Sequence, residues 1–281
     1  MSQRHKKNYY KGIALKLASI VAEAKHLHYG YFERGLKPEL KNLAAAQDNY
    51  LQKLLGFIPK TKVKRILDVG CGTGSVAAEL VNRGYEVTCL APDPYLIQRT
   101  REATNDRVAT LTMMYENITD ELPEQSFDLI LMSESCQYIK PPTGWPQHIR
   151  FLRPGGYILV ADFFRIKTAD ERNPSRSGQM WDDFLAYAKQ HNFTVIKEKD
   201  ITKFTAPTMD IYQSFINEKA IPSIDLLLEL IERAAPWLYR ILKPFLKNRL
   251  LKLKSRYQKQ GGDLFQEYKR YMTVLLQKAP A

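Results

Sequence analysis

Short apolar runs alternate with segments of helical periodicity along the first two thirds of the chain. The apolar run Val63–Val69 is followed by Ser75–Val81, in which apolar side chains at 76, 77, 80 and 81 share one side of a helix. The pattern repeats, and further strands are expected at residues 87–90, 108–114, 126–132, 157–163 and 193–200. Strands that alternate with helices in this way predict an α/β protein with a doubly wound sheet.

Helical patterns flank this alternating region on both sides. Residues 13–24 and 43–55 carry apolar side chains at helical spacing and precede the first strand. After the strand at 193–200, about seventy residues have helical character before the next strand at 271–276, which is far more than a turn requires. One helix is expected to begin at Ser223 as its N-cap, and another to begin after Pro236.

A glycine-rich turn joins the first strand to the first helix of the sheet. It reads Asp68-x-Gly70-x-Gly72-x-Gly74, and it places free backbone N–H groups and a helix N-terminus above the sheet. Glycines allow positive φ and a close approach of a ligand to the backbone. The turn is not a P-loop, because no Gly-Lys-Ser/Thr follows, and Ser75 stands where a dinucleotide-binding turn has its third glycine. The sequence therefore predicts a nucleotide-type binding turn.

The octet from Leu67 to Gly74 resembles the first motif of class I S-adenosylmethionine (SAM) dependent methyltransferases. The strand at 126–132 is similar to the "sFDlv" signature of that family, and the turn at 153–156 is similar to its "LkPGG" turn. The aromatic segment at 28–36 resembles the "HYGYW" segment of the small-molecule, tocopherol- and coclaurine-type members, where it helps to close a lid over the cofactor. An aromatic cluster that packs a loop is the alternative reading of this segment.

This resemblance implies a Rossmann-like, mostly parallel seven-stranded sheet whose last strand runs antiparallel to its neighbours. The expected organisation is N-terminal lid helices at 1–60, a SAM-binding core at 61–205, a helical substrate-cap insert at 206–262, and the last strand of the core sheet at 263–281.

The resemblance also implies which residues bind SAM. They come from the lid, the glycine turn and the ends of the next strands: Tyr29, Asp68, Gly70, Cys71, Gly72, Gly74, Asp93, Glu116, Asn117 and Ser133. The family usually holds the ribose with an acid at the end of the second strand, where this chain has Ala91, so Asp93 is the substitute. Asp93 is equally well placed to cap the helix that starts at Pro94. Glu116 takes the place of the acid that bonds the adenine amino group.

Candidate residues for the acceptor side follow the fourth strand. Glu134-Ser135 matches a pair in the tocopherol-type relatives, and Tyr138 stands where those relatives have a histidine. We expect Tyr138 to be the residue that positions the acceptor; an aromatic side chain that packs a helix start is the alternative. A single acid such as Glu134 is too few ligands for magnesium, so no metal is expected.

The charge of the chain indicates its binding partners, and its cysteine content indicates its cellular location. The chain carries 42 Lys plus Arg against 30 Asp plus Glu, a formal charge of +12, which favours an anionic membrane, nucleic acid or an acidic substrate. The spacing of its three cysteines fits neither a metal site nor a disulfide framework, and no apolar run is long enough to span a bilayer. These two observations predict a cytoplasmic location, with peripheral membrane contact as an option. Residues 240–260 carry eight cations and no acid, so 236–260 is a candidate for contact with an anionic membrane, or a roof over an apolar substrate pocket.

The sequence therefore predicts a SAM-dependent methyltransferase that acts on an apolar or lipid-like small molecule. An RNA methyltransferase is the enzymatic alternative, but the chain lacks an Asn-Pro-Pro-Tyr-type motif, which makes nucleic acid an unfavoured partner. A SAM-binding protein without transferase activity, joined to a membrane by its basic helix, is the third hypothesis.

Overall fold

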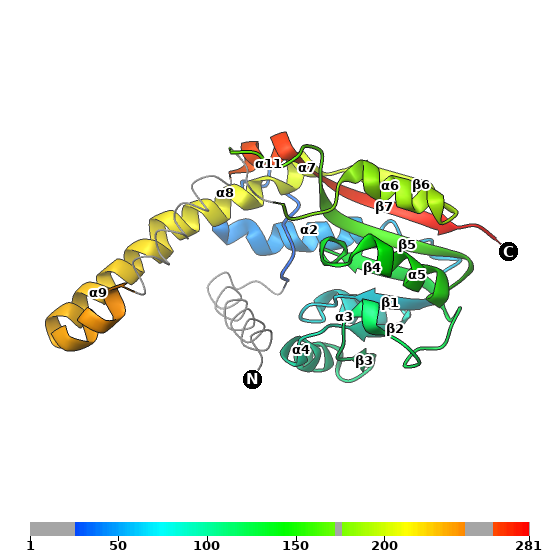
Figure 1. Ribbon diagram of the computed structural model, residues 1–281, viewed down its shortest axis with the longest axis horizontal. Helices are drawn as coiled ribbons and strands as arrows, with labels where there is room; N and C mark the ends of the chain where they lie inside the picture. Colours follow the sequence, from blue (N-terminus) through cyan, green and yellow to red (C-terminus); the bar gives the residue numbers. More distant parts are fainter. Residues whose placement is uncertain (1–25, 172–175, 245–260, 281) are drawn as a thin grey trace.

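A seven-stranded sheet forms the centre of the molecule (Figure 1). The computed structural model describes residues 26–171, 176–244 and 261–280. The strand order is β3-β2-β1-β4-β5-β7-β6, and only β7 runs antiparallel to its neighbours. The strands are β1 (Arg65–Val69), β2 (Glu86–Leu90), β3 (Ala109–Leu111), β4 (Phe127–Ser133), β5 (Leu152–Arg165), β6 (Phe193–Asp200) and β7 (Lys269–Lys278). The predicted fold, with its antiparallel last strand, is confirmed.

Helices cover both faces of this sheet, because strands such as β4 alternate their apolar side chains between two cores. Leu129 and Leu131 pack on one face with α2 (Leu43–Leu55) and α3 (Ser75–Asn82). Ile130 and Met132 pack on the other face with α5 (Pro141–Phe151) and α6 (Trp181–Gln190). Side chains that alternate across the pleat and are buried on both faces are typical of a covered parallel sheet.

The order of the strands reverses between β1 and β4, and this reversal fixes the place of a ligand site. From β1 the chain moves outward to β2 and β3 by way of α3 and α4 (Pro94–Thr104), and then returns to pair β4 with β1. The loops after β1 and β4 therefore diverge at the carboxyl edge of the sheet, where open α/β sheets bind ligands.

The segment before the last strand forms one long, interrupted helix that leaves the core. It starts with α7 (Thr202–Thr205) and α8 (Pro207–Ser214), passes through the π-helical turn Phe215–Ala220, and continues as α9 (Ile221–Ala234). Residues 236–244 are again helical. The predicted helix start at Ser223 is wrong: Ser223 lies inside α9, and the wide π-helical turn just before Pro222 lets the helix run on where a proline would otherwise break it.

Other expectations differ from the structure in extent. The helix at 43–55 has the predicted bounds, whereas the third strand is shorter than expected. The range 263–281 is not all strand, because α11 (Gly262–Tyr268) precedes β7. The predicted helix at 13–24 and residues 245–260 of the basic segment lie outside the described residues.

Candidate cofactor and active site

The glycine turn bends sharply between β1 and α3. The N–H of Gly70 donates to the carbonyl of Leu90 at 2.7 Å, and the N–H of Gly74 donates to the carbonyl of Cys71 at 3.0 Å. Gly70, Gly72 and Gly74 all have positive φ. The N–H of Cys71 also donates to the carbonyl of Leu90, at 3.2 Å, so the turn is held to the end of β2.

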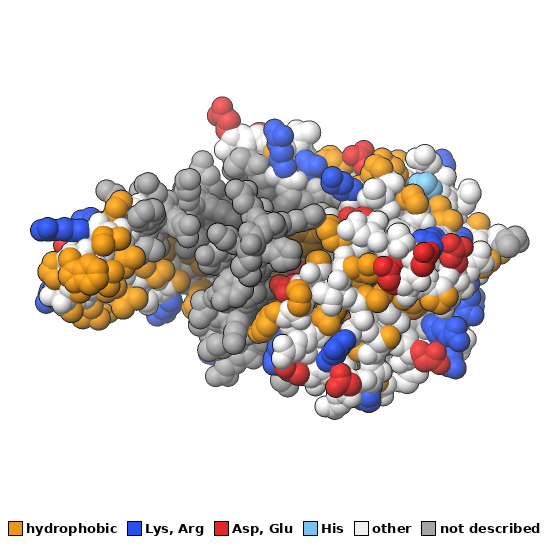
Figure 2. Space-filling view, turned by 60° about the horizontal axis from the view of Figure 1, so that its bottom comes forward, with side chains coloured by type: hydrophobic (Ala, Val, Ile, Leu, Met, Phe, Trp, Pro, Cys, Tyr) orange, Lys and Arg blue, Asp and Glu red, His pale blue; other side chains and the backbone are white. Residues whose placement is uncertain are grey.

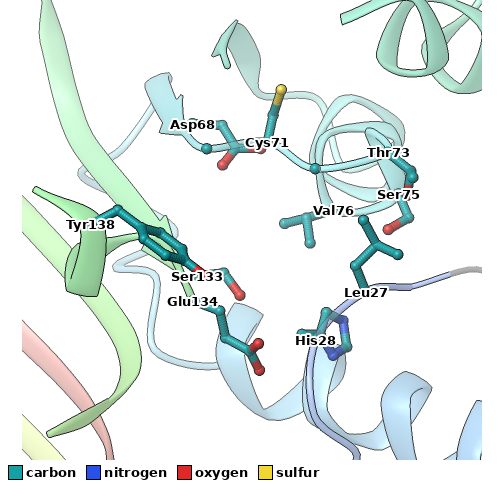
Figure 3. A pocket seen from close by; sticks show the side chains of 12 residues that line it. Leu27, His28, Asp68, Cys71, Thr73, Ser75, Val76, Ser133, Glu134 and Tyr138 are labelled. Atoms are coloured by element: carbon teal, nitrogen blue, oxygen red, sulfur yellow. The ribbon is translucent and has the colours of Figure 1, made fainter. Parts of the chain in front are cut away.

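A first cavity of about 210 Å³ lies between this turn, the end of β4 and the segment before α2 (Figure 3). Figure 3 shows Asp68 and Cys71 on one side, Leu27 and His28 opposite them, and Ser133, Glu134 and Tyr138 on a third side. Thr73, Ser75 and Val76 of the turn and of α3 complete the wall, together with Gly70 and Gly72. This cavity has the polar character that the amino-acid part of a ligand requires.

A second cavity of about 350 Å³ lies on the other side of the turn, at the ends of β2 and β3. Four residues line both cavities, namely Gly70, Gly72, Glu134 and Tyr138, so the two cavities are parts of one cleft. Apolar groups dominate the second wall, together with the acids Asp93 and Glu116: they are Val69, Leu90, Ala91, Pro92, Leu96, Met113, Met114, Tyr115 and Ile139. An apolar slot with a few polar groups suits an adenosine-like moiety.

Asp68 is a buried acid at the base of the cleft. Its side chain is almost fully enclosed, and among the described residues no hydrogen-bond donor reaches its Oδ2. Burial raises the pKa of this carboxyl to about 7. A buried carboxyl without a donor is costly unless a cation or a donor group binds beside it, so this wall of the cleft fits a positively charged ligand.

Glu134 is the acid that lines both cavities. Its Oε1 accepts hydrogen bonds from the N–H of Tyr29 at 2.6 Å and from the hydroxyl of Tyr271 at 2.7 Å. Burial raises the pKa of Glu134 to about 8, against these two donors, which lower it. Glu134 has a φ of 55°, a left-handed conformation that is uncommon for a residue with a side chain and is often found at functional sites.

A chain of hydroxyl groups supports Glu134 from behind. Tyr50 of α2 lies 3.1 Å from Oγ of Ser133 and 3.0 Å from the hydroxyl of Tyr271. The Tyr271 hydroxyl has one proton to donate, and both Oε1 of Glu134 and the hydroxyl of Tyr50 lie within hydrogen-bond distance of it. Because Oε1 accepts two hydrogen bonds, a proton on Glu134 has to be carried by Oε2.

The aromatic segment is fixed to three parts of the fold. Besides the bond from Tyr29 to Glu134, the N–H of Gly30 donates to Oγ1 of Thr208 in α8 at 3.0 Å. The ring of His28 stacks on Tyr50 with centroids 4.2 Å apart, and its Nδ1 donates to the carbonyl of Tyr29 at 2.9 Å. Burial lowers the pKa of His28 to about 3, so this ring is neutral. Leu27 and His28 are the residues of the segment that reach the first cavity.

The predicted cofactor residues fall into two groups. Asp68, Gly70, Cys71, Gly72 and Ser133 line the first cavity, and Asp93 and Glu116 line the second. The remaining three, Tyr29, Gly74 and Asn117, line neither cavity, and their contact with the cofactor stays a prediction.

Each of those three has a structural role in place of a cavity wall. The Tyr29 ring lies among Phe163, Phe265 and Tyr271. A Cβ on Gly74 would meet α4, so this glycine allows helix packing. Asn117 belongs to the short 3-10 helix Tyr115–Asn117 beside the second cavity, but it does not line it.

Tyr138 lies at the junction of the two cavities. It ends the 3-10 turn Cys136–Tyr138, its side chain is 69% exposed, and it lines both cavities. Asp162 of β5 holds this turn in place, because it accepts hydrogen bonds from the backbone N–H of Gln137 at 2.9 Å and from its side chain at 3.2 Å. The backbone of this turn is thus held in place, and Tyr138 lies where a ligand in either cavity would meet it.

Sequence reasoning missed the supporting residues Tyr50, Asp162 and Tyr271. They come from α2, β5 and β7, and no local motif connects them. His28 was detectable, since it begins the segment that carries the lid resemblance.

Asp93 offers a test that separates its two predicted roles. Its side chain caps α4 by accepting a bond from the N–H of Tyr95 at 3.0 Å, and it also lines the second cavity. Because asparagine caps helices as well as aspartate does, we expect Asp93→Asn to keep the melting temperature of the wild type. If Asp93 also binds a ribose, the same variant should bind S-adenosylhomocysteine about tenfold more weakly by calorimetry, since hydrogen bonds to a charged group are the stronger ones.

Asp93→Ala is the matched variant for this test. It should lose both the affinity and about 1 kcal/mol of stability, because alanine cannot cap. Unchanged affinity in Asp93→Asn would reduce Asp93 to a helix cap.

Comparisons with known proteins agree with this geometry. Residues 67–160 match the family model described as a methyltransferase domain. An uncharacterised methyltransferase of Mycobacterium tuberculosis is 29% identical over 145 residues, and this match covers 51% of each protein, so the aligned part spans about half the length of that relative.

Two solved structures share the fold over nearly the whole chain. The [4+2]-cyclase SpnF has a TM-score of 0.68 at 16% identity and covers 97% of this chain and 94% of its own. Geranyl diphosphate C-methyltransferase from Streptomyces coelicolor, solved with S-adenosyl-L-homocysteine, has a TM-score of 0.65 at 14% identity and covers 93% of this chain and 91% of its own.

The fold, the glycine turn and these matches define a class I SAM-dependent methyltransferase domain, which in this chain contains the matched residues 67–160. The cofactor of this class is SAM. The cleft fits that cofactor, because a polar cavity with an unpartnered buried acid adjoins an apolar cavity that ends in two further acids.

Proposed function

We propose that this protein transfers a methyl group from SAM to an apolar small molecule. The observation that carries the proposal is the continuous cleft across the glycine turn, with Asp68 and Glu134 in its polar part and Asp93 and Glu116 in its apolar part. The chain carries an excess of 12 positive charges, yet the described residues that line the cleft include four acids and neither lysine nor arginine. Such a wall favours a cationic sulfonium over its neutral product.

In this proposal, SAM supplies an electrophilic methyl group, and the protein supplies position and the exclusion of water. The acids Asp68 and Glu134 hold the positive end of the donor, while Asp93 and Glu116 hold its nucleoside. Tyr138 faces both cavities and orients the acceptor. The positive charge of bound SAM lowers the pKa of Glu134, so that Oε2 of its carboxylate can receive a proton if the acceptor must lose one, while Oε1 stays engaged by Tyr29 and Tyr271.

The proposal also specifies that the molecule that accepts the methyl group is apolar. Its support is the exposed Tyr138 ring and the adjacent Ile139 at the mouth of the cleft, together with the structural neighbour that acts on geranyl diphosphate. The assignment to the tocopherol or coclaurine type, and the absence of a metal requirement, remain predictions.

Substitution of Tyr138 tests the catalytic part. We expect S-adenosylhomocysteine to bind the wild type in calorimetry, and labelled SAM to methylate a component of an apolar extract. Tyr138→Phe keeps the ring and should retain most of the turnover, whereas Tyr138→Ala should lose about tenfold or more in kcat/KM, because a misplaced acceptor forfeits the proximity effect. If Tyr138→Ala turned over as fast as the wild type, Tyr138 would not belong to the acceptor site. Failure of the wild type to bind S-adenosylhomocysteine would overturn the whole proposal.

A SAM-binding protein without methyl transfer is the second candidate. The observation in its favour is the similarity in fold to a [4+2]-cyclase. Binding of S-adenosylhomocysteine without label transfer to any extract would support it. RNA remains an unfavoured acceptor, because the cleft wall is acidic.

The predicted contact of 236–260 with an anionic membrane and the cytoplasmic location also remain proposals. Residues 236–244 form a helix with exposed Trp237 and Ile241, which supports the contact. Among the described helices, none is long and apolar enough to cross a bilayer.

A further inference from the structure

The long helical segment before the last strand presents apolar side chains to solvent. We call residues 207–244 the arm. Figure 1 shows α9 projecting away from the sheet, and Figure 2 shows apolar side chains gathered at the free end of the molecule. Leu226, Leu227 and Leu230 are spaced to lie close together on α9, and Trp237 and Ile241 lie one turn apart in the helix that follows. All five side chains are more than half exposed.

The described core does not cover this surface. Ile221, the first residue of α9, is the only buried residue of that helix. No residue of the arm lines either cavity of the cleft, so the described part of the insert does not roof the cofactor site. Five of the nine large apolar side chains that are exposed in the described part of the chain lie on the arm. Such a concentration is typical of an interaction surface.

The charges around the arm indicate the partner. The acids of α9, Asp225, Glu229 and Glu232, lie together along one edge of the helix, apart from the exposed leucines. From Arg240 to Lys259 the sequence carries eight cations and no acid, and this stretch directly follows Trp237. An amphipathic helix with apolar and aromatic side chains next to a basic stretch is the composition that binds an anionic lipid surface.

We propose that the exposed apolar side chains of the arm, Leu226, Leu227, Leu230, Trp237 and Ile241, dock on an anionic lipid bilayer. The leucines enter the boundary between head groups and acyl chains, Trp237 lies at that boundary, and the acidic edge of α9 faces water. A bilayer satisfies the apolar side chains and the neighbouring cations together.

Vesicle flotation tests this proposal on the full-length protein. Wild type should float with phosphatidylcholine vesicles that contain phosphatidylglycerol, and much less with phosphatidylcholine alone, because the cations contribute about 1 kcal/mol each near an anionic surface. The triple variant Leu226→Ser, Leu227→Ser, Leu230→Ser should lose about tenfold or more of its partition coefficient, since each serine removes apolar area from the bound state.

A matched triple variant distinguishes apolar docking from general charge attraction. Asp225→Ser, Glu229→Ser, Glu232→Ser changes the same number of residues on the same helix, and it should float as well as wild type or better. Both variants should keep the circular dichroism and the S-adenosylhomocysteine affinity of the wild type, because the arm does not line the cleft.

Three results would overturn the proposal. One is a wild type that stays in solution with anionic vesicles, and another is a leucine variant that floats as well as the wild type. The third is a dimer in light scattering that the leucine variant dissociates while flotation is unaffected, which would identify a second copy as the occupant.

Discussion

Gly74→Ala is expected to destabilise the fold by about 3 kcal/mol or more. Gly74 has a φ of 81°, and a Cβ at this position would lie 2.5 Å from the backbone Cα of Thr100 in α4. The left-handed conformation costs a residue with a side chain about 1–2 kcal/mol, and overpacking adds about 1–3 kcal/mol. Denaturant unfolding followed by circular dichroism measures the loss.

Gly72→Ala is the matched control for this prediction. Gly72 also has positive φ, at 59°, but the nearest atom to an added Cβ is Cδ1 of Leu27 at 3.9 Å. This variant should therefore lose about 1–2 kcal/mol from the backbone conformation alone. Its methyl group would enter the cleft, so its affinity for S-adenosylhomocysteine should fall more than its stability indicates. Equal stability losses in the two variants would contradict the packing role of Gly74.

Glu134 is expected to make the protein less stable as the pH rises, and Glu134→Gln should remove this contribution. In the protein without cofactor, burial raises the pKa of Glu134 to about 8 and those of Asp68 and Asp162 to about 7. A carboxyl whose pKa is raised by folding binds protons more tightly in the folded state than in the unfolded state. Its favourable contribution is therefore complete below the unfolded pKa, near 4, and is lost as the pH rises through the folded pKa.

The contribution of Glu134 to the free energy of unfolding should therefore fall by on the order of 4 kcal/mol between about pH 5 and pH 8.5, while the neutral His28 ring acts in the opposite direction below its ordinary pKa. Glu134→Gln removes this titration but leaves an oxygen that can accept from Tyr29 and Tyr271, so the aromatic segment stays attached. Urea unfolding at a series of pH values measures the slope for both proteins.

Glu134→Ala supplies the comparison that identifies the cause. It removes the titration and also the two hydrogen bonds, so it should show the flatter profile of Glu134→Gln at a lower overall stability. A profile of Glu134→Gln that is as steep as that of the wild type would mean that Glu134 is not the group that titrates.

Much of the fold could be predicted from sequence because its signals are local. Helix α2 has the predicted bounds, since its apolar side chains repeat at helical spacing over 13 residues. The glycine turn fixed the place of β1 and α3 through eight consecutive residues. The start of α9 was mispredicted for the opposite reason: Ser223 looks like a cap, but the helix had already begun at Pro207 and passed through a π-helical turn that no local pattern announces.

From sequence, only those residues of the candidate site could be predicted that belong to a local motif or lie at the end of a strand. Asp68, Asp93 and Glu116 each follow or end a strand, so motif and position indicated them, and all three line the cleft. Tyr50 and Tyr271 are separated by 221 positions and meet only because β7 lies next to β5. Tyr29 was expected to contact the cofactor, and this stays a prediction; its N–H bonds to Glu134, and its ring packs against three aromatic rings from β5, α11 and β7 that no local pattern connects to it.

The position of β7 has a consequence for how the protein forms during synthesis. Of the seven strands of the sheet, β7 is made after the other six, yet it lies between β5 and β6. Until the ribosome has released residues 269–278, β6 has no neighbour, β5 exposes an open edge, and Glu134 lacks the hydroxyl of Tyr271. A nascent chain that has completed the other six strands is therefore still prone to aggregate through these edges. In such a chain Glu134 also lacks one of its two hydrogen-bond donors. Ribosome-stalled chains of increasing length should acquire protease resistance in one late step as β7 emerges.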